Sequence, residues 1–188
     1  MLFGMKNRLS TSNQRIILCE GPDKVGKSEI AKALSKKYGI PYIKNTSEWS
    51  AGLRNPDYFV NTLRYAEPYF LSYLKQSGAS VVLDRSYPSE QVYSEAFGRT
   101  TDHDALKFVD EEYAKLGAQI VICHRSSYEG IKDDLFPDDI EERKLQELDD
   151  LYTNFASKTK CKVLRLNVDD ENLSRELEDI SLFLECQD

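Results

Sequence analysis

The residues best suited to chemistry lie in one short stretch, Glu20-Gly21-Pro22-Asp23-Lys24-Val25-Gly26-Lys27-Ser28. The stretch fits the pattern G-x-x-x-x-G-K-[S/T], in which glycines let backbone amides turn inward around phosphate oxygens. Lys27 would bring a positive charge to the outer phosphates, and the Ser28 hydroxyl would bind Mg²⁺. The sequence therefore predicts an ATP-binding loop made of Gly21, Pro22, Asp23, Lys24, Val25, Gly26, Lys27 and Ser28.

Asp23 is unexpected in this loop, because a carboxylate inside an anion-binding turn repels the ligand unless it points elsewhere. It could bond a hydroxyl group or a Mg²⁺-bound water of a second substrate. It could equally be a turn residue whose side chain supports the loop backbone. The loop residues alone leave both interpretations open.

A second cluster follows the apolar stretch 80–84, which ends in Asp84-Arg85. In open α/β sheets, ligands bind at the carboxyl ends of the strands. Asp84 could hold Mg²⁺ directly or through water, and the planar guanidinium of Arg85 could clamp a phosphate. The alternative is an Asp–Arg ion pair that only closes the end of the strand.

Polar and aromatic residues surround this second cluster. Ser89 and Tyr93 are four residues apart and would share one face of a helix that begins near Pro88. Arg64 lies on the preceding long helix, and Glu90 is next to Ser89. An aromatic wall with a few polar groups suits a planar nucleobase, although ordinary packing explains most single tyrosines.

Helical and strand patterns alternate along the chain and indicate the elements that position these residues. Apolar strands are predicted at 15–20, 80–84, 118–124 and 162–168, with a short one near 41–45. Helices are predicted at 27–38, 55–78 with a kink at Pro68, 89–97, 102–116, 138–158 and 171–185. This alternation predicts a three-layer α/β/α fold with a parallel sheet. We expect a flexible leader at 1–13 and a single domain at 14–188.

Composition narrows the class of protein. The 188 residues carry a formal net charge of −7, which argues against an extended nucleic-acid surface. The four cysteines are scattered without C-x-x-C spacing and are expected to be reduced. No apolar run approaches the roughly 20 residues of a membrane span, and residues 1–14 do not resemble a secretory signal. We therefore expect a cytoplasmic protein.

The motifs resemble those of the thymidylate kinase family. The family's E-G-x-D-x-x-G-K-[S/T] loop is matched by Glu20, Gly21, Asp23, Gly26, Lys27 and Ser28. Its D-R-[Y/F/H]-x-x-S-x-x-A-Y segment is matched by Asp84, Arg85, Ser89 and Tyr93. Arg64 also matches, as the arginine about twenty residues before the D-R pair. The resemblance implies the nucleoside-monophosphate-kinase form of the P-loop fold, with a five-stranded sheet of order 2-3-1-4-5.

The resemblance also implies roles for single residues. Asp23 would bond the 3′-hydroxyl of an acceptor deoxynucleotide or its metal shell. Arg85 would hold the acceptor 5′-phosphate, with Asp84 near Mg²⁺. Arg64 would contact the edge of the thymine base. Tyr93 would occupy the space of a 2′-hydroxyl and so exclude ribonucleotides.

Cations around the transferring phosphoryl group would complete such a site. Lys24 stands where one subgroup of the family has a catalytic arginine, and a lysine there keeps the charge but lacks the planar fork. A lid is expected at about 125–144, although the family's lid pattern is missing. Arg125 and Arg143 are the candidate lid cations, with Arg143 counted among the catalytic residues.

Other departures concern the acceptor. The family's R-E-P motif is absent, and the corresponding stretch is Ile43-Lys44-Asn45-Thr46-Ser47-Glu48-Trp49. Ser86 replaces the usual aromatic residue after the D-R pair. Glu90 would lie near the base, where a carboxylate could select a different or modified pyrimidine. Ser89 and Glu90 are therefore included among the predicted acceptor-binding residues.

The sequence favours ATP- and Mg²⁺-dependent phosphorylation of a deoxynucleoside 5′-monophosphate, dTMP or a related pyrimidine, by a chain that could form a homodimer. One alternative is a deoxynucleoside kinase, which needs a general base such as Glu48. Another is a kinase acting on a modified base or a polynucleotide end. A nucleotide-binding regulator without transferase activity is disfavoured, since the chain retains Lys27, Ser28, Asp84 and Arg85.

Overall fold

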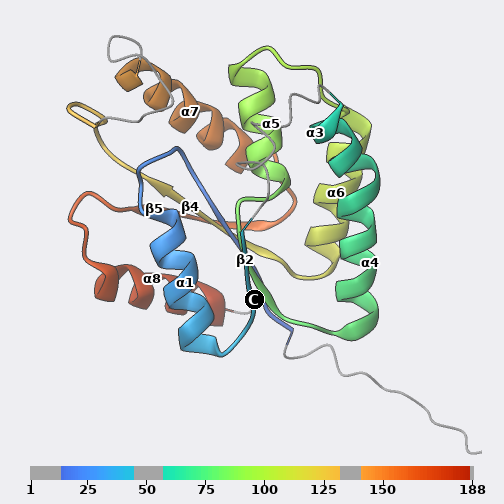
Figure 1. Ribbon diagram of the computed structural model, residues 1–188. Helices are drawn as coiled ribbons and strands as arrows, with labels where there is room; N and C mark the ends of the chain where they lie inside the picture. The colour runs from blue at the N-terminus through green and yellow to red at the C-terminus, as the bar shows by residue number, and fades with distance from the viewer. Residues whose placement is uncertain (1–13, 45–56, 132–140, 187–188) are drawn as a thin grey trace, which may run out of the picture.

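A five-stranded parallel sheet forms the centre of the molecule (Figure 1). The computed structural model describes residues 14–44, 57–131 and 141–186. The strand order β2-β3-β1-β4-β5 confirms the order implied by the sequence motifs. The strands are, in chain order, β1 (Ile16–Glu20), β2 (Tyr42–Lys44), β3 (Val81–Asp84), β4 (Gln119–His124) and β5 (Lys162–Asn167).

The central strand β1 is buried along its whole length, as its unbroken apolar sequence predicts for a strand covered on both faces. Leu18 is in register with Leu83 of β3 on one side and with Ile120 of β4 on the other. Because all strands run in parallel, their carboxyl ends meet at one edge of the sheet. Glu20 and Asp84 end β1 and β3 at that edge.

Helices cover both faces of the sheet, which confirms the three-layer architecture. On one face α1 (Lys27–Tyr38) packs beside α8 (Leu173–Glu185). On the other face lie α4 (Glu67–Ser77), α5 (Tyr87–Ala96), α6 (His103–Lys115) and α7 (Glu141–Ala156) (Figure 1). Within that second layer α5 contacts both α6 and α7.

The long helix before β3 contains a π turn where the sequence predicted a kink at Pro68. The α-helical segment α3 (Tyr58–Asn61) passes into the π segment η1 (Thr62–Ala66) and then into α4. Pro68 has no backbone N–H to donate to the carbonyl of Arg64. The helix passes into the proline-bearing turn through a wider spacing, in which the Glu67 amide donates to the Thr62 carbonyl.

Predicted helix ends agree well with the structure. Gly39 and Gly78 adopt left-handed conformations that end α1 and α4. Asp102 begins α6, and its carboxylate accepts a hydrogen bond from the Ala105 amide. The predicted leader at 1–13 lies outside the described residues, as do Glu48 and residues 132–140 of the expected lid.

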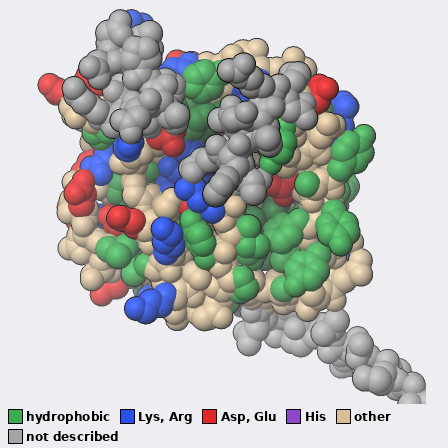
Figure 2. Space-filling model, in the orientation of Figure 1, with side chains coloured by type: hydrophobic (Ala, Val, Ile, Leu, Met, Phe, Trp, Pro, Cys, Tyr) green, Lys and Arg blue, Asp and Glu red, His purple; other side chains and the backbone are tan. Residues whose placement is uncertain are grey.

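Aromatic side chains are exposed along the long helix. Figure 2 shows hydrophobic side chains gathered over the right-hand part of the molecule, where α4 lies. Tyr65, Tyr69 and Tyr73 are exposed there at four-residue spacing.

Within the described ranges, none of the helices combines the length and the apolar character that crossing a lipid bilayer would require.

Candidate active site

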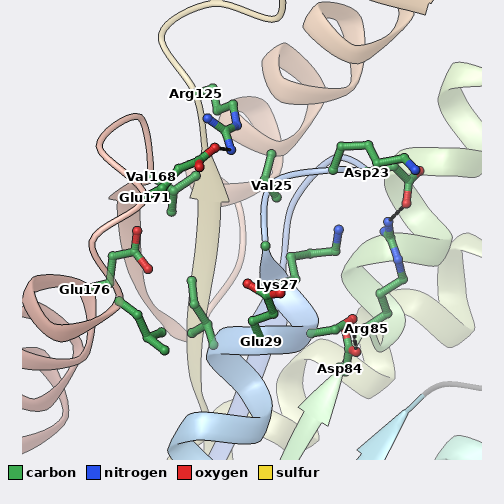
Figure 3. A pocket seen from close by; sticks show the side chains of 15 residues that line it. Asp23, Val25, Lys27, Glu29, Asp84, Arg85, Arg125, Val168, Glu171 and Glu176 are labelled. Atoms are coloured by element: carbon green, nitrogen blue, oxygen red, sulfur yellow. Dashed lines mark hydrogen bonds and ion pairs between the residues drawn. The ribbon is translucent and has the colours of Figure 1, made fainter. Parts of the chain in front are cut away.

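The predicted phosphate loop joins β1 to the N-terminus of α1 at the carboxyl edge of the sheet (Figure 3). Gly21 has φ +133°, and a Cβ atom there would lie 2.2 Å from the Cys123 carbonyl oxygen, so only glycine fits. Gly26 is also left-handed, with φ +77°. Lys24 adopts φ +61° between them and is exposed. The backbone thus curves as an anion-binding loop requires.

This loop borders a cavity of about 650 Å³, a typical size for a small-molecule site. We call it the loop cavity. It receives every predicted loop residue from Asp23 to Ser28, together with Asp84 and Arg85 from the end of β3. Its far side is formed by residues that follow β4 and β5, namely Arg125, Val168, Glu171, Leu173 and Glu176. Figure 3 shows the Lys27 side chain extending from the start of α1 on the side of the loop that faces Asp23 and Arg85.

Lys27 is buried within the phosphate loop, where its ammonium group is suited to bind an anion. Its side chain is only 6% exposed, and its ammonium group donates to the Pro22 carbonyl of the same loop. Burial, with the nearby Arg85 charge, lowers the pKa of Lys27 to about 8. A phosphate group in the loop would favour the charged ammonium and reverse this shift.

Ser28 and Asp84 come together as the sequence predicts for a metal site. The Ser28 hydroxyl donates to Asp84 Oδ2 over 2.6 Å, and the Tyr42 hydroxyl donates to the same oxygen over 2.7 Å. Asp84 is buried at the end of β3 and borders the loop cavity. A hydroxyl and a carboxylate beside a phosphate loop are the hard oxygen ligands that Mg²⁺ prefers, so these residues fit the metal.

Arg85, Asp23 and Tyr93 form a second group, which we call the Arg85 cluster. Arg85 Nη2 forms an ion pair with Asp23 Oδ1 and also donates to the Tyr93 hydroxyl over 3.0 Å. The Tyr93 hydroxyl in turn donates to Asp23 Oδ2 over 2.6 Å. The three predicted residues thus meet at one point, and each is already satisfied by the others.

Charge within the cluster is balanced despite its burial. Arg85 is only 8% exposed and sits on a left-handed backbone with φ +66°. Burial disfavours the ionised form of Asp23, but the charges of Arg85 and Lys27 outweigh it and lower the pKa of Asp23. Asp23 therefore neutralises a cation that would otherwise be buried alone.

A third group lies beneath Arg85 and consists of Glu20, Ser89 and Tyr152, which we call the Glu20 network. The Ser89 hydroxyl donates to Glu20 Oε2 over 2.5 Å, and Ser89 and Tyr152 oxygens are 2.8 Å apart. Burial raises the pKa of Glu20 to about 7, although its hydrogen bond from Ser89 and the Arg85 charge act in the opposite direction. Neither Glu20 nor Tyr152 was assigned a role from sequence.

Three predicted site residues, Arg64, Glu90 and Arg143, belong neither to the phosphate loop and its cavity nor to the Arg85 cluster or the Glu20 network. The Arg64 guanidinium is half exposed and pairs with Asp102 at the start of α6 over 2.5 Å. Glu90 accepts hydrogen bonds from the Ser94 hydroxyl on α5 and from Arg99, which follows α5 in the chain. Arg143 is exposed on α7. The predicted contacts of Arg64 and Glu90 with an acceptor base, and of Arg143 with the phosphoryl group, stay predictions.

Arg125, the other candidate lid cation, does border the cavity. Its Nη2 pairs with Glu171 Oε1 over 2.8 Å, at the opposite end from Asp23 and Arg85 (Figure 3). Glu176 of α8 lines the same end and is only 4% exposed. Burial raises the pKa of Glu176. This end of the cavity therefore carries carboxylates, in contrast to the cationic loop.

Comparison with known proteins supports the fold. No family model and no curated protein matches the chain. Among solved structures, the YorR protein of Bacillus subtilis, crystallised with phosphorylated GDP, is 24% identical over 92% of this chain and 96% of its own, with a TM-score of 0.66. A thymidylate kinase from Ehrlichia chaffeensis is 15% identical over 90% and 98% of the two chains, with a TM-score of 0.56.

A deoxyadenosine kinase from M. mycoides with bound dCTP is 17% identical over 93% of this chain and all of its own, with a TM-score of 0.52. These likenesses lie below 25% identity and concern the course of the backbone. They show that the chain has the fold of P-loop nucleotide and deoxynucleoside kinases.

Proposed function

We propose that this protein transfers the γ-phosphoryl group of ATP to a deoxynucleoside 5′-monophosphate, dTMP or a related pyrimidine nucleotide, with Mg²⁺. The observation that carries the proposal is the position of Arg85. Its guanidinium is buried beside the phosphate loop and bonded to Asp23 of that loop. A second phosphate-binding cation at this point brings an anionic acceptor next to the ATP phosphates.

The loop cavity would hold ATP. Backbone amides of the loop and the N-terminus of α1 would surround its phosphates, and Lys27 would neutralise their outer oxygens. Ser28 and Asp84 would hold Mg²⁺, which supplies charge neutralisation at the phosphate oxygens. The preorganised loop would keep these groups in place without further rearrangement.

The acceptor would enter by replacing hydrogen bonds within the Arg85 cluster. Its 5′-phosphate would take the place of the Asp23 carboxylate at Arg85 Nη2, since both are anions with the same planar partner. Asp23 would then be free to accept a hydrogen bond from a sugar hydroxyl, with Tyr93 beside it. The acceptor oxygen is already ionised, so the reaction needs positioning and charge neutralisation rather than a general base.

A deoxynucleoside kinase is the alternative with the same fold. Its acceptor is an uncharged hydroxyl, which would gain little from a buried guanidinium. The charge of Arg85 and its pairing with a displaceable carboxylate favour the monophosphate. The preference for a pyrimidine, with Arg64 and Glu90 near the base, is proposed on the motif resemblance alone.

The experiment that tests this function is a panel assay. The protein is incubated with Mg·ATP and each deoxynucleoside or its 5′-monophosphate, and ADP formation and the product are measured. We expect turnover with at least one monophosphate and little with the matching nucleoside. Turnover confined to nucleosides would establish the alternative kinase, and absence of any acceptor-dependent turnover would overturn the phosphotransferase proposal.

A further inference from the structure

We propose that Tyr152 and Glu20 are positioning residues that hold the guanidinium of Arg85 in the orientation needed to bind the acceptor phosphate. This inference rests on the proposed function, because it assigns Arg85 to the acceptor. It concerns two residues from distant parts of the chain, one at the end of β1 and one on α7. Neither residue borders the loop cavity, so both would act through Arg85.

Arg85 Nη1 makes the contacts that orient the guanidinium. It donates to the Ser89 hydroxyl over 3.1 Å, to the Tyr152 hydroxyl over 3.3 Å and to the Gly21 carbonyl over 3.3 Å. All three acceptors lie on the buried side of the group. The opposite nitrogen, Nη2, faces Asp23 and Tyr93. One edge of the guanidinium is therefore anchored while the other edge meets the partners that a ligand would replace.

Glu20 determines whether the Ser89 and Tyr152 hydroxyls, which lie between it and Arg85, donate or accept hydrogen bonds. Ser89 has a single proton and donates it to Glu20 Oε2 over 2.5 Å, which leaves its lone pairs facing Arg85 Nη1. The Tyr152 hydroxyl lies 2.8 Å from Ser89 Oγ and 3.4 Å from Glu20 Oε2. It can donate toward this pair while accepting from Arg85. The carboxylate thus makes both hydroxyls acceptors for the guanidinium.

Glu20 also holds the backbone on which Arg85 is carried. Its other oxygen, Oε1, accepts a hydrogen bond of 2.7 Å from the Ser86 amide, directly after Arg85. Arg85 itself has a left-handed backbone, with φ +66°, a conformation that non-glycine residues adopt at some cost. A bond on the next residue and bonds to the side chain together hold this conformation. Four segments, β1, the end of β3, α5 and α7, therefore converge on one arginine.

The test is the Tyr152→Phe variant, which removes one hydroxyl and keeps the buried ring. We expect KM for the monophosphate to rise about fivefold to twentyfold, less than the full effect of a hydrogen bond to a charged group, because the 3.3 Å contact is long and acts on the acceptor only through Arg85. KM for ATP and kcat should stay within about twofold. Tyr113→Phe is the matched control, since Tyr113 is also buried and donates to a carboxylate, Glu67, away from the cavity.

A double mutant distinguishes positioning from general loosening of the fold. In an Arg85→Lys background, Tyr152→Phe should add less than about twofold, because the group it positions is gone. A multiplied effect in that background, or equal rises in both KM values, would overturn the positioning role. Glu20→Gln provides a second variant should Tyr152→Phe prove unstable, with the same expected preference for the acceptor KM.

The two proposals fail differently. If the wild-type protein turns over a monophosphate and Tyr152→Phe leaves its KM unchanged, only the positioning role is wrong. If the wild type turns over no acceptor, calorimetric titration with dTMP replaces kinetics: binding weakened by Tyr152→Phe and not by Tyr113→Phe supports the role. Equal binding to both variants, or no binding to the wild type, overturns it.

Discussion

The two sides of the site are built in different ways. The phosphate loop is eight consecutive residues, 21–28, of which Asp23 to Ser28 border the loop cavity. The Arg85 cluster and the Glu20 network draw side chains from β1, the loop, the end of β3, α5 and α7. The form of the loop follows from its own consecutive residues, whereas the proposed acceptor side is assembled only when the whole chain has folded.

The two sides also differ in how far their charged groups are already paired within the protein. Lys27, which borders the loop cavity, donates a hydrogen bond to a neutral carbonyl, that of Pro22. In the Arg85 cluster, a cation and a carboxylate already neutralise each other, and Tyr93 bonds to both. ATP would therefore fill a prepared space, while the acceptor must exchange one set of bonds for another. Variants on the two sides should separate these behaviours.

The largest effect is expected for Lys27→Ala. Removal of the buried Lys27 ammonium, which borders the loop cavity, should lower kcat by about 10²–10³-fold, as for loss of one strong electrostatic contact in a transition state. The fold should persist, since the lysine is costly to bury in the first place. Steady-state kinetics and a thermal melt measure the two quantities. Retained turnover would show that the loop has been assigned wrongly.

Arg85→Ala should act on the acceptor side and leave ATP nearly unaffected. Loss of a charged hydrogen-bonding group should raise the monophosphate KM by about 10–100-fold. Asp23 would keep its bond from Tyr93 but lose its cation. Separate titrations of ATP and of the monophosphate give the two KM values. Equal increases in both would mean that Arg85 does not distinguish the two substrates.

Tyr93→Ala should have a smaller effect, on the choice of sugar. If the Tyr93 ring occupies the space of a 2′-hydroxyl, its removal should improve kcat/KM for a ribonucleotide relative to the deoxynucleotide by roughly tenfold. Competition between the two monophosphates measures this ratio. Tyr93→Phe is the control, because it keeps the ring and removes only the bonds to Asp23 and Arg85. An unchanged ratio in Tyr93→Ala would place sugar selection elsewhere.

The smallest effect concerns pH and the phosphate loop alone. Burial lowers the pKa of Lys27 to about 8, whereas bound phosphate would favour the ammonium. Above pH 8, ATP binding must then take up a proton, and affinity should fall by up to about tenfold per pH unit. Calorimetry in buffers of different ionisation enthalpy should detect this uptake at pH 9 but not at pH 7. Lys27→Arg, which stays charged, should abolish it.

The contrast between the two sides also explains what could be predicted from the sequence. The loop and the positions of the strands follow from local patterns, because glycines, a lysine and buried apolar runs carry their meaning within a few residues, whereas the strand order was predicted only through the family resemblance. The meeting of Asp23, Arg85 and Tyr93 was predicted through a family resemblance, and their mutual bonding was not. It depends on parallel strands placing residues more than sixty positions apart at one edge of the sheet.

Tyr152 and Glu20 show where sequence patterns carry too little information. Tyr152 lies on the buried face of α7, where a tyrosine is indistinguishable from other core residues until its hydroxyl is seen to meet Arg85. Glu20 matched a motif but gave no sign of its partners. Arg64 shows the reverse case. The family resemblance implied a base contact, but Asp102 at the start of α6 is its ion-pair partner in the structure.

The π segment before Pro68 affects how the length of this helix can change without disturbing the rest of the fold. Thr62–Ala66 holds one residue more than α-helical spacing would need, so it is equivalent to a single-residue insertion within a helix. Deleting that residue would turn the segment Tyr58–Asn61 by about 100° around the helix axis. The Phe59 ring, whose centroid now lies 4.1 Å from Arg99 Cζ, would face another direction. Deletion of a single residue would thus change the packing of α3 against the segment between α5 and α6, while the sheet and the phosphate loop keep their structure.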